Sequence, residues 1–203
     1  GVTPNLLICN ESQPARTVKD LVELCRAKPG QISFGSAGTG SAQHLALEMF
    51  MLAARVKAIH VPYKGSGPML TDLIGGTIQY SFDTMTAATP HVKSGKAIAL
   101  AQTRQNRVSA YANVPTMAES GFPGFEATTW YGLAGPAKLP IAMAKRMNED
   151  VNKVMQMPDV LEKLAASGAQ DGGGSIEKFG EFMLAEQAKW AKIIKDGGVK
   201  GEA

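Results

Sequence analysis

Short apolar runs alternate with amphipathic, helix-like segments over the first 123 residues, and this alternation limits the fold more than any other feature of the sequence. The strand-like runs are residues 6–9, 32–34, 58–61, 78–82 and 97–101. The segments between them carry helix boundary signals: Thr17 caps the first, with Asp20 three residues on, and a glycine pair, Gly75 and Gly76, ends a later one. A strand–helix repeat of this kind predicts an α/β fold with a mostly parallel sheet and flanking helices.

A loop of small residues, 35–41, connects the second strand-like run to a helix with apolar residues spaced four and three apart. Small residues let the backbone approach a ligand, and a helix N-terminus favours an anion through its unpaired N–H groups and its dipole. The glycines follow G-x-x-G-x-G, which is neither the dinucleotide fingerprint nor a Walker A loop. The loop is a candidate carboxylate or phosphate cradle; the alternative is a turn whose glycines only close the strand–helix connection.

The alternation ends near residues 121–124, which include two glycines and a proline. Residues 125–133 are expected to form one long strand, and the rest of the chain is expected to be helical. Pro140 suits the start of one helix, a short helix covers 159–166, and Ser175 caps a final helix. These helices have apolar faces but almost no sheet of their own, so we infer a second lobe that is only partly present.

Composition and charge exclude several classes of protein. The chain has 203 residues, of which 44% are hydrophobic, and its net charge is only +3 with dispersed basic residues, so no nucleic-acid partner is expected. No apolar run approaches the roughly 20 residues that span a bilayer, and the opening residues lack the pattern of a signal peptide. Cys9 and Cys25 lie in apolar surroundings, which favours two small buried side chains; a disulfide is the alternative.

Polar side chains near the ends of the apolar runs are candidate ligand contacts. Asp83 directly follows such a run and could accept a ligand amine or orient a hydroxyl, or it could cap the next helix. Ser66 and Thr84 carry the same two alternatives of cap and ligand donor. Lys64 could pair with a carboxylate or remain solvated.

Residues for catalysis or metal binding are not apparent. The three histidines, His44, His60 and His91, show no metal-ligand spacing with one another or with cysteine or carboxylate residues. There is no G-x-S-x-G motif and no recognisable pairing of a nucleophile with a base. We therefore expect no metal, no cofactor and no enzymatic activity.

Several segments, taken in order and spacing, closely resemble the Bug-type solute-binding proteins of tripartite tricarboxylate transporters. They are FGSAGTGSAQHLALEMF (34–50), HVPYKGSGPMLTDLIGG (60–76), SFDTMTAATPHVKSGKAIALA (81–101), NVPTMAESGFPGFEATTWYGLAGPA (113–137) and the final EQAKWAKIIKDGG (186–198). The resemblance covers essentially the whole chain, and the VPYKG and VPT-x-x-E-x-G-x-P-G-F runs are its most specific signals.

The resemblance implies a type II periplasmic binding protein-like fold, in which two α/β lobes hinged by crossing strands close on a small solute. Family members begin with further residues, including a signal peptide and the first lobe's own Gly-rich loop, so the chain is expected to be an N-terminally truncated member. Residues 12–123 would then form one complete lobe. Residues 1–11 and 124–203 would supply the crossing strands, 6–10 and 125–131, and the C-terminal helical part of an incomplete first lobe.

The implied function is that of a periplasmic or otherwise extracytoplasmic protein that captures a small carboxylate in an interlobe cleft. The solute would be a di- or tricarboxylate, an amino acid or a related organic acid, delivered to the membrane components of a tripartite transporter or to a sensor ectodomain. On the matching positions, Asp83 sets specificity at the far end of the ligand, and the carboxylate donors are Ser36, Ala37, Gly38, Thr39 and Ser41.

The missing half of the cleft predicts weak or absent ligand binding, and an uncovered helical face predicts self-association of the chain. Two other functions remain as alternatives. A ligand-sensing domain of a transcription regulator can share this fold, but no helix-turn-helix segment is visible. A small α/β enzyme acting on an anionic substrate would need a nucleophile–base pair or a metal set.

Overall fold

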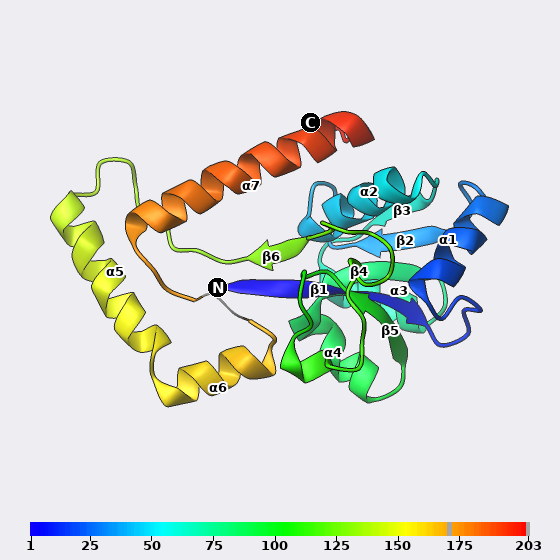
Figure 1. The fold of residues 1–203 in the computed structure, drawn as a ribbon, viewed down its shortest axis with the longest axis horizontal. Coiled ribbons are helices and arrows are strands. Elements are labelled where there is room, and N and C mark those ends of the chain that lie inside the picture. The colour runs from blue at the N-terminus through cyan, green and yellow to red at the C-terminus, as the bar shows by residue number, and fades with distance from the viewer. Residues whose placement is uncertain (170–171, 202–203) are drawn as a thin grey trace.

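A six-stranded sheet forms the centre of the computed structural model, which describes residues 1–169 and 172–201 (Figure 1). The strands are β1 (Val2–Asn10), β2 (Ser33–Ser36), β3 (Ile59–Pro62), β4 (Tyr80–Thr84), β5 (Ala97–Gln102) and β6 (Thr128–Trp130). Their order across the sheet is β3-β2-β4-β1-β5, and β6 pairs with the start of β1.

Helices cover both faces of this sheet. α1 (Val18–Ala27) and α2 (Ala42–Ala54) pack with Leu7 and Cys9 of β1 in one core cluster. α3 (Ser66–Ile74) and α4 (Met85–Lys93) pack with Leu6 and Ile8 in the other. Because successive side chains of a strand point to opposite faces, β1 contributes to both clusters, which explains its unbroken apolar run.

The directions of the strands differ in part from the expectation. The α/β class is confirmed, and the sheet is mixed: β2 to β6 run in one direction, as a mostly parallel sheet requires, and β1 runs against them. β2 is parallel to β3 and β4, whereas β1 is antiparallel to β4, β5 and β6. The start of β1 extends beyond the sheet to pair with β6, and Asn5 lies opposite Thr84 at the end of β4, so β1 enters from the edge where β4 ends. The alternation of strands and helices along the chain predicts which elements form. It does not predict the direction in which β1 runs.

The long strand expected over residues 125–133 is shorter, because little backbone is available to pair with it. Pairing runs only from Val2 opposite Trp130 to Pro4 opposite Thr128, and beyond that point β1 is flanked by β4 and β5. Before β6, the Ala127 N–H donates to the carbonyl of Thr103 instead. Of the two segments expected to cross between lobes, 125–131 pairs over three residues with Val2–Pro4 of β1. The other expected segment, 6–10, pairs with β4 and β5 instead.

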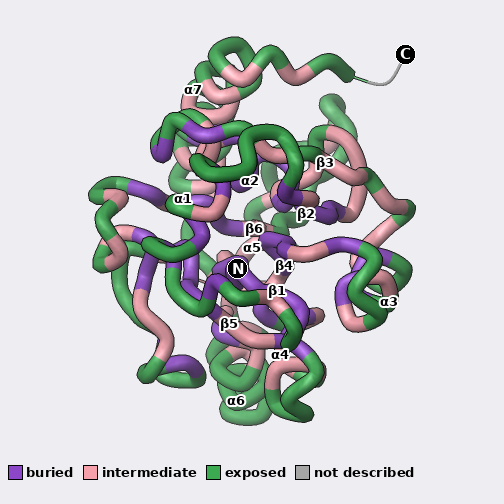
Figure 2. Tube along the Cα trace, turned by 90° about the vertical axis from the view of Figure 1, so that its right-hand side faces the viewer, coloured by how far each residue is buried: buried purple, intermediate pink, exposed green. Residues whose placement is uncertain are grey.

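The C-terminal part is helical, as expected, and consists of α5 (Ile141–Met155), α6 (Pro158–Ala166) and α7 (Ile176–Gly197). α5 stands apart from the sheet in Figure 1, and neither α5 nor α6 contains a buried residue. In Figure 2, α6 and α7 are mainly exposed or intermediate. Large apolar side chains are exposed on these helices: Ile141, Met143, Met147, Val154, Leu161, Met183, Leu184 and Ile194.

Two C-terminal helices contact the lobe: α6 reaches the 3-10 helix η1 (Ser109–Tyr111), and α7 makes the more extensive contact. α7 packs along α2, and Trp190 lies partly buried against the first core cluster. Near its start, Phe179 and Phe182 meet the ring of Trp130 edge-on, with centroid distances of 5.9 and 5.6 Å. Within the described part of the chain, no helix is both long and apolar enough to cross a membrane.

Several local predictions are confirmed. The side chains of Thr17 and Ser175 accept hydrogen bonds from the backbones of Asp20 and Lys178 and so cap α1 and α7. Cys9 and Cys25 are free and buried. Burial raises the pKa of both thiols, that of Cys25 to about 11, which suits packing rather than reactivity.

Candidate functional site

The glycine loop, residues 35–41, connects the end of β2 to the N-terminus of α2. Ser41 is the N-cap of α2: its side chain accepts from the His44 N–H, and its own N–H donates to the carbonyl of Gly38. Gly38 and Gly40 have φ angles of 137° and 76°, which only glycine adopts without strain. The expected Gly-rich connection is therefore present, and its N–H groups lie at the positive end of a helix.

A second segment, residues 62–66, lies alongside this loop. The Tyr63 N–H donates to the carbonyl of Ser36, and the Gly65 N–H donates to the carbonyl of Ala37. A Cβ added at Gly38 would lie 3.3 Å from the Tyr63 carbonyl oxygen, so the two backbones are in close contact. Lys64 is exposed on this second segment, next to the loop.

Asp83 lies at the centre of a buried polar cluster, which we call the Asp83 cluster and which also includes Gln43, Ser66 and Thr84. Its Oδ1 accepts from the Ser66 hydroxyl at 2.7 Å, the Thr84 N–H at 2.8 Å and the Gln43 amide at 3.2 Å. The residue is completely buried, and Oδ2 has no hydrogen-bond partner among the described residues. The cluster thus brings together three candidate residues, and adds Gln43.

The cap of α4 is Thr84 and not Asp83. Thr84 accepts from the Ala87 N–H at 3.3 Å, whereas Asp83 is the fourth residue of β4. Burial raises the pKa of the Asp83 carboxyl above its usual value, and the hydrogen bonds from Ser66 and Gln43 oppose that shift. A buried carboxylate oxygen without a partner is costly, which is the condition expected of a group that awaits a ligand donor.

Two histidines lie behind the glycine loop, and the sequence predicted no role for them. The rings of His44 and His60 stack with centroids 3.6 Å apart and planes within 4°. His60 Nε2 lies 2.7 Å from the hydroxyl of Ser36, and His44 Nδ1 accepts from the Gly40 N–H at 3.0 Å. The spacing of His44 and Glu48, four residues apart on one helix, was the available sequence signal. The approach of His60 depends on the pairing of β3 with β2, which no local pattern predicts.

The residues predicted for the site therefore fall in one region. Ser36, Ala37, Gly38, Thr39 and Ser41 form the loop, with Ser36 fully buried and Ala37 to Thr39 partly exposed. Gln43 lies two residues beyond Ser41 and reaches Asp83, so the loop and the Asp83 cluster are adjacent. Among the described residues, no group of three or more His, Cys, Asp or Glu side chains could hold a metal ion.

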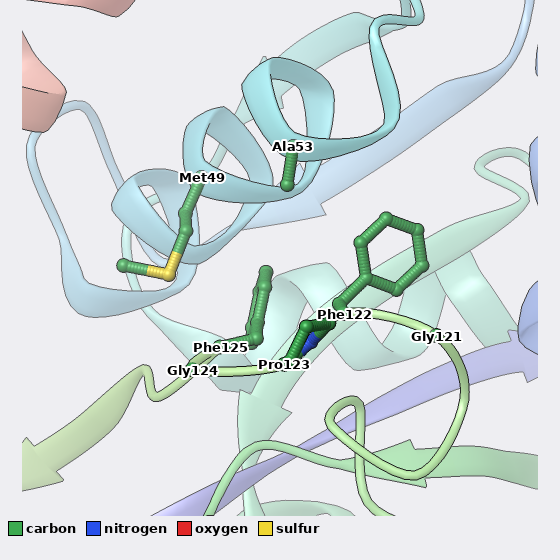
Figure 3. A pocket seen from close by; sticks show the side chains of 7 residues that line it. All are labelled: Met49, Ala53, Gly121, Phe122, Pro123, Gly124 and Phe125. Atoms are coloured by element: carbon green, nitrogen blue, oxygen red, sulfur yellow. The ribbon is translucent and has the colours of Figure 1, made fainter.

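A separate pocket lies further along α2 and does not coincide with this region. It has a volume of about 400 Å³ and is lined by Met49, Ala53 and residues 121–125 (Figure 3). Its side chains are apolar, so it offers a carboxylate no charged or hydroxyl partner. The polar groups of the glycine loop and the Asp83 cluster are better suited to an anion.

Comparisons with known proteins agree with the geometry. The family model described as "Tripartite tricarboxylate transporter family receptor" matches residues 2–199. "Protein BugT" of Bordetella pertussis is 32% identical over 200 residues, which cover 98% of this chain and 61% of BugT. The chain thus spans less than two thirds of the length of this relative.

Two solved structures have the same fold over nearly the whole chain. "R. palustris Rpa4515 with adipate" superimposes with a TM-score of 0.92 at 34% identity and covers 98% of this chain and 66% of that one. "Structure of periplasmic binding protein BugD" gives a TM-score of 0.88 at 29% identity, over 99% of this chain and 68% of that one. The chain belongs to the tripartite tricarboxylate transporter receptor family, a family of solute-binding receptors and not of enzymes.

Proposed function

We propose that this chain supplies the carboxylate-binding lobe of a periplasmic receptor for a small organic acid. The observation that carries the proposal is the convergence of the glycine loop, at the N-terminus of α2, with a buried aspartate whose Oδ2 lacks a hydrogen-bond partner in the described part of the chain. The loop presents N–H groups to an anion. Asp83 presents an acceptor a short distance away, since Gln43, two residues beyond the loop, donates a hydrogen bond to it. The site therefore suits a molecule with a carboxylate at one end and a donor at the other.

The carboxylate donors in this proposal come from the loop. Ala37 and Thr39 supply backbone N–H groups, and Thr39 and Ser41 supply hydroxyls. Gly38 shapes the loop, since its N–H already donates to the Ser36 hydroxyl at 3.2 Å. Ser41 accepts from the His44 N–H, which leaves its own proton available to a ligand. The buried hydroxyl of Ser36 is also proposed as a donor, and it contacts His60 and Gly38. The Gly40 N–H is excluded, because it already donates to His44.

The other end of the ligand is proposed to meet Asp83. An ionised Asp83 accepts from an ammonium or hydroxyl group, whereas a second ligand carboxylate would be repelled by it unless one of the two were protonated. Ser66 and Thr84 act through Asp83 by holding its Oδ1. Lys64, exposed on the neighbouring segment, attracts the anion without a fixed position.

The second wall of the cleft is proposed to come from another lobe. Residues 12–123 would form the complete lobe, and residues 1–11 and 124–203 the crossing strands and part of the other one. The exposed apolar side chains on α5, α6 and α7 support this division, since such a face needs a cover. In this arrangement the receptor would deliver its ligand to the membrane components of a tripartite transporter or to a sensor ectodomain.

Calorimetric titration with matched ligands tests the proposal. The probes are 6-aminohexanoate, adipate and hexylamine, applied to this chain and to a chimera in which it replaces the matching part of BugT. We expect the chimera to bind the two acids and not hexylamine, with weaker binding by the chain alone. Binding of hexylamine as tightly as the acids, or of none of a wider panel of carboxylates by a folded chimera, would refute the proposed function.

A further inference from the structure

The stacked rings of His44 and His60, which we call the histidine stack, connect the glycine loop to the lobe behind it. His44 comes from the first turn of α2 and is 5% exposed; His60 comes from β3. Each ring contacts a different part of the loop: His44 contacts Gly40, and His60 contacts Ser36. The stack therefore reaches both ends of the segment that is proposed to hold the carboxylate.

Geometry assigns the proton on His44. The Gly40 N–H can only donate, so Nδ1 of His44 must be the bare, accepting nitrogen. The single proton of the neutral ring then lies on Nε2, which is 3.3 Å from Oε1 of Glu48. A second proton, on Nδ1, would point at the Gly40 N–H and remove the hydrogen bond that shapes the loop.

His60 is held in its neutral form by the same arrangement. Burial, together with the neighbouring His44, lowers the pKa of His60 to about 4, and Glu48 acts weakly in the opposite direction. Protons on both rings would place two cations 3.6 Å apart, so the stacked geometry opposes double protonation.

The stack is faced by α2, by β2 and, across Glu48, by α7. On α2 the facing charge is Glu48, and β2 contributes the uncharged hydroxyl of Ser36. α7 packs on α2 through Gly197, where an added Cβ would lie 2.8 Å from Oε2 of Glu48, so its backbone covers the carboxylate. Two pairs of charged side chains on α7 lie within that helix, Glu186 with Lys189 and Lys192 with Asp196.

We propose that His44 and His60 are positioning residues that, anchored by Glu48, hold the glycine loop in its carboxylate-binding shape, and that the loop is released when Nδ1 of His44 takes a proton and loses the Gly40 hydrogen bond. The consequence for a ligand rests on the proposed function; the coupling of the loop to the rings does not. Affinity falls in acid because only the neutral stack supports the binding shape, and it falls about tenfold one pH unit below the midpoint of the transition.

Nuclear magnetic resonance of the ¹⁵N-labelled chain tests the coupling without a ligand. Ring nitrogens and the amides of residues 36–41 are followed from pH 8 to pH 4. We expect the neutral His44 ring to carry its proton on Nε2, and loop amide shifts that follow the protonation of Nδ1 with the same midpoint. A neutral ring with its proton on Nδ1, or loop amides that do not respond while the rings titrate, would overturn the proposal.

Two variants of His44 separate positioning from mere packing. In His44→Asn the amide oxygen replaces Nδ1 as the acceptor for Gly40 and cannot be protonated, so the loop shape remains and its acid transition is reduced. In His44→Gln the amide instead reaches towards Glu48, and the Gly40 bond is lost at every pH. Equal pH profiles in the wild type and His44→Asn would contradict a positioning role, whatever the melting temperatures.

Binding of 6-aminohexanoate to the BugT chimera between pH 7.5 and pH 5.5 completes the test, because the ligand keeps both charges over this range. We expect the loss of affinity in acid to be smaller in His44→Asn than in the wild type. Asp83 also titrates, but it is present in both proteins, so the difference between them reports the stack. If no ligand binds at any pH while the loop amides still follow the rings, the proposed function fails and the positioning role stands.

Discussion

The hydroxyl of Ser66, the first residue of α3, donates a 2.7 Å hydrogen bond to Oδ1 of Asp83 near the end of β4. This bond ties a helix on one face of the sheet to the strand edge beside the glycine loop. It also uses the same carboxylate oxygen as the Gln43 amide and the Thr84 N–H, so that Oδ2 has no partner among residues 1–169 and 172–201. The asymmetry of this one carboxylate is the basis of the ligand chemistry that we propose.

Asp83→Asn is expected to change which ligand is preferred. The wild-type carboxylate favours the ammonium of 6-aminohexanoate over the second carboxylate of adipate, and a charged hydrogen bond of this kind contributes about 1.5 to 3 kcal/mol. The ratio of the two dissociation constants should therefore fall at least tenfold in the variant, by calorimetry on the BugT chimera. Asp20→Asn, at the exposed start of α1, is the control and should leave the ratio unchanged. An unchanged ratio in Asp83→Asn would mean that this carboxylate does not contact the ligand.

Gly38→Ala is expected to distort the glycine loop. The φ angle of 137° is unfavourable for alanine, and the added Cβ would lie 3.3 Å from the Tyr63 carbonyl oxygen. We expect a loss of about 1 to 3 kcal/mol in the free energy of unfolding, together with loss of carboxylate binding. Gly30→Ala is the matched control: its φ is 67°, and no atom lies within 4 Å of the added Cβ. Urea unfolding and calorimetry should show reduced stability in both variants but loss of binding in Gly38→Ala alone.

Acid is expected to destabilise the chain through His60. The pKa of His60 is about 4 in the folded state against an ordinary 6.5, so between these values the unfolded state binds more protons. Folding stability therefore falls as the pH falls through this window, by about 2 to 3 kcal/mol for this group. Asp83 acts in the opposite sense, since its raised pKa contributes stability that is lost as the pH rises. His60→Gln keeps an amide near Ser36 and should flatten the fall between pH 6.5 and pH 4 in urea titrations; a parallel curve would exclude His60 as its source.

Self-association of the chain is expected through its exposed apolar helices. Met143 and Met147 lie four residues apart on α5 and are 53% and 52% exposed. Replacing both by lysine should shift sedimentation-velocity profiles towards the monomer without changing the far-ultraviolet circular dichroism spectrum. A wild-type chain that remains monomeric at high micromolar concentration would contradict this prediction.

Much of the fold could be predicted because its signals are local. Thr17 and Ser175 indicate where helices begin, because their side chains cap them. The strands of the sheet are covered on both faces and therefore appear in the sequence as apolar runs. The direction of β1 could not be predicted, since it depends on pairing with β4, some seventy residues away. The length of β6 depends in the same way on how much of β1 is free to pair.

The candidate site was likewise predictable where its signals are local and not where they depend on tertiary contacts. The glycine loop was visible because glycine at positive φ is a local requirement, and Asp83 was visible because it follows an apolar run. Gln43 and His60 were missed, because their roles depend on contacts with Asp83 and Ser36 that form only when α2, β3 and β4 come together. The alternative interpretation of Asp83 as a helix cap is wrong by one residue. β4 continues past Asp83 to Thr84, and Thr84 caps α4.

The most direct test of the central claim is a titration of the ¹⁵N-labelled chain followed through its backbone amides, which detects even weak binding. With 6-aminohexanoate we expect saturable shifts of Ala37, Gly38 and Thr39, and with hexylamine we expect none at these amides. Shifts with both ligands, or shifts confined to the apolar pocket around Met49 and Phe122, would contradict the assignment of the glycine loop as the carboxylate site.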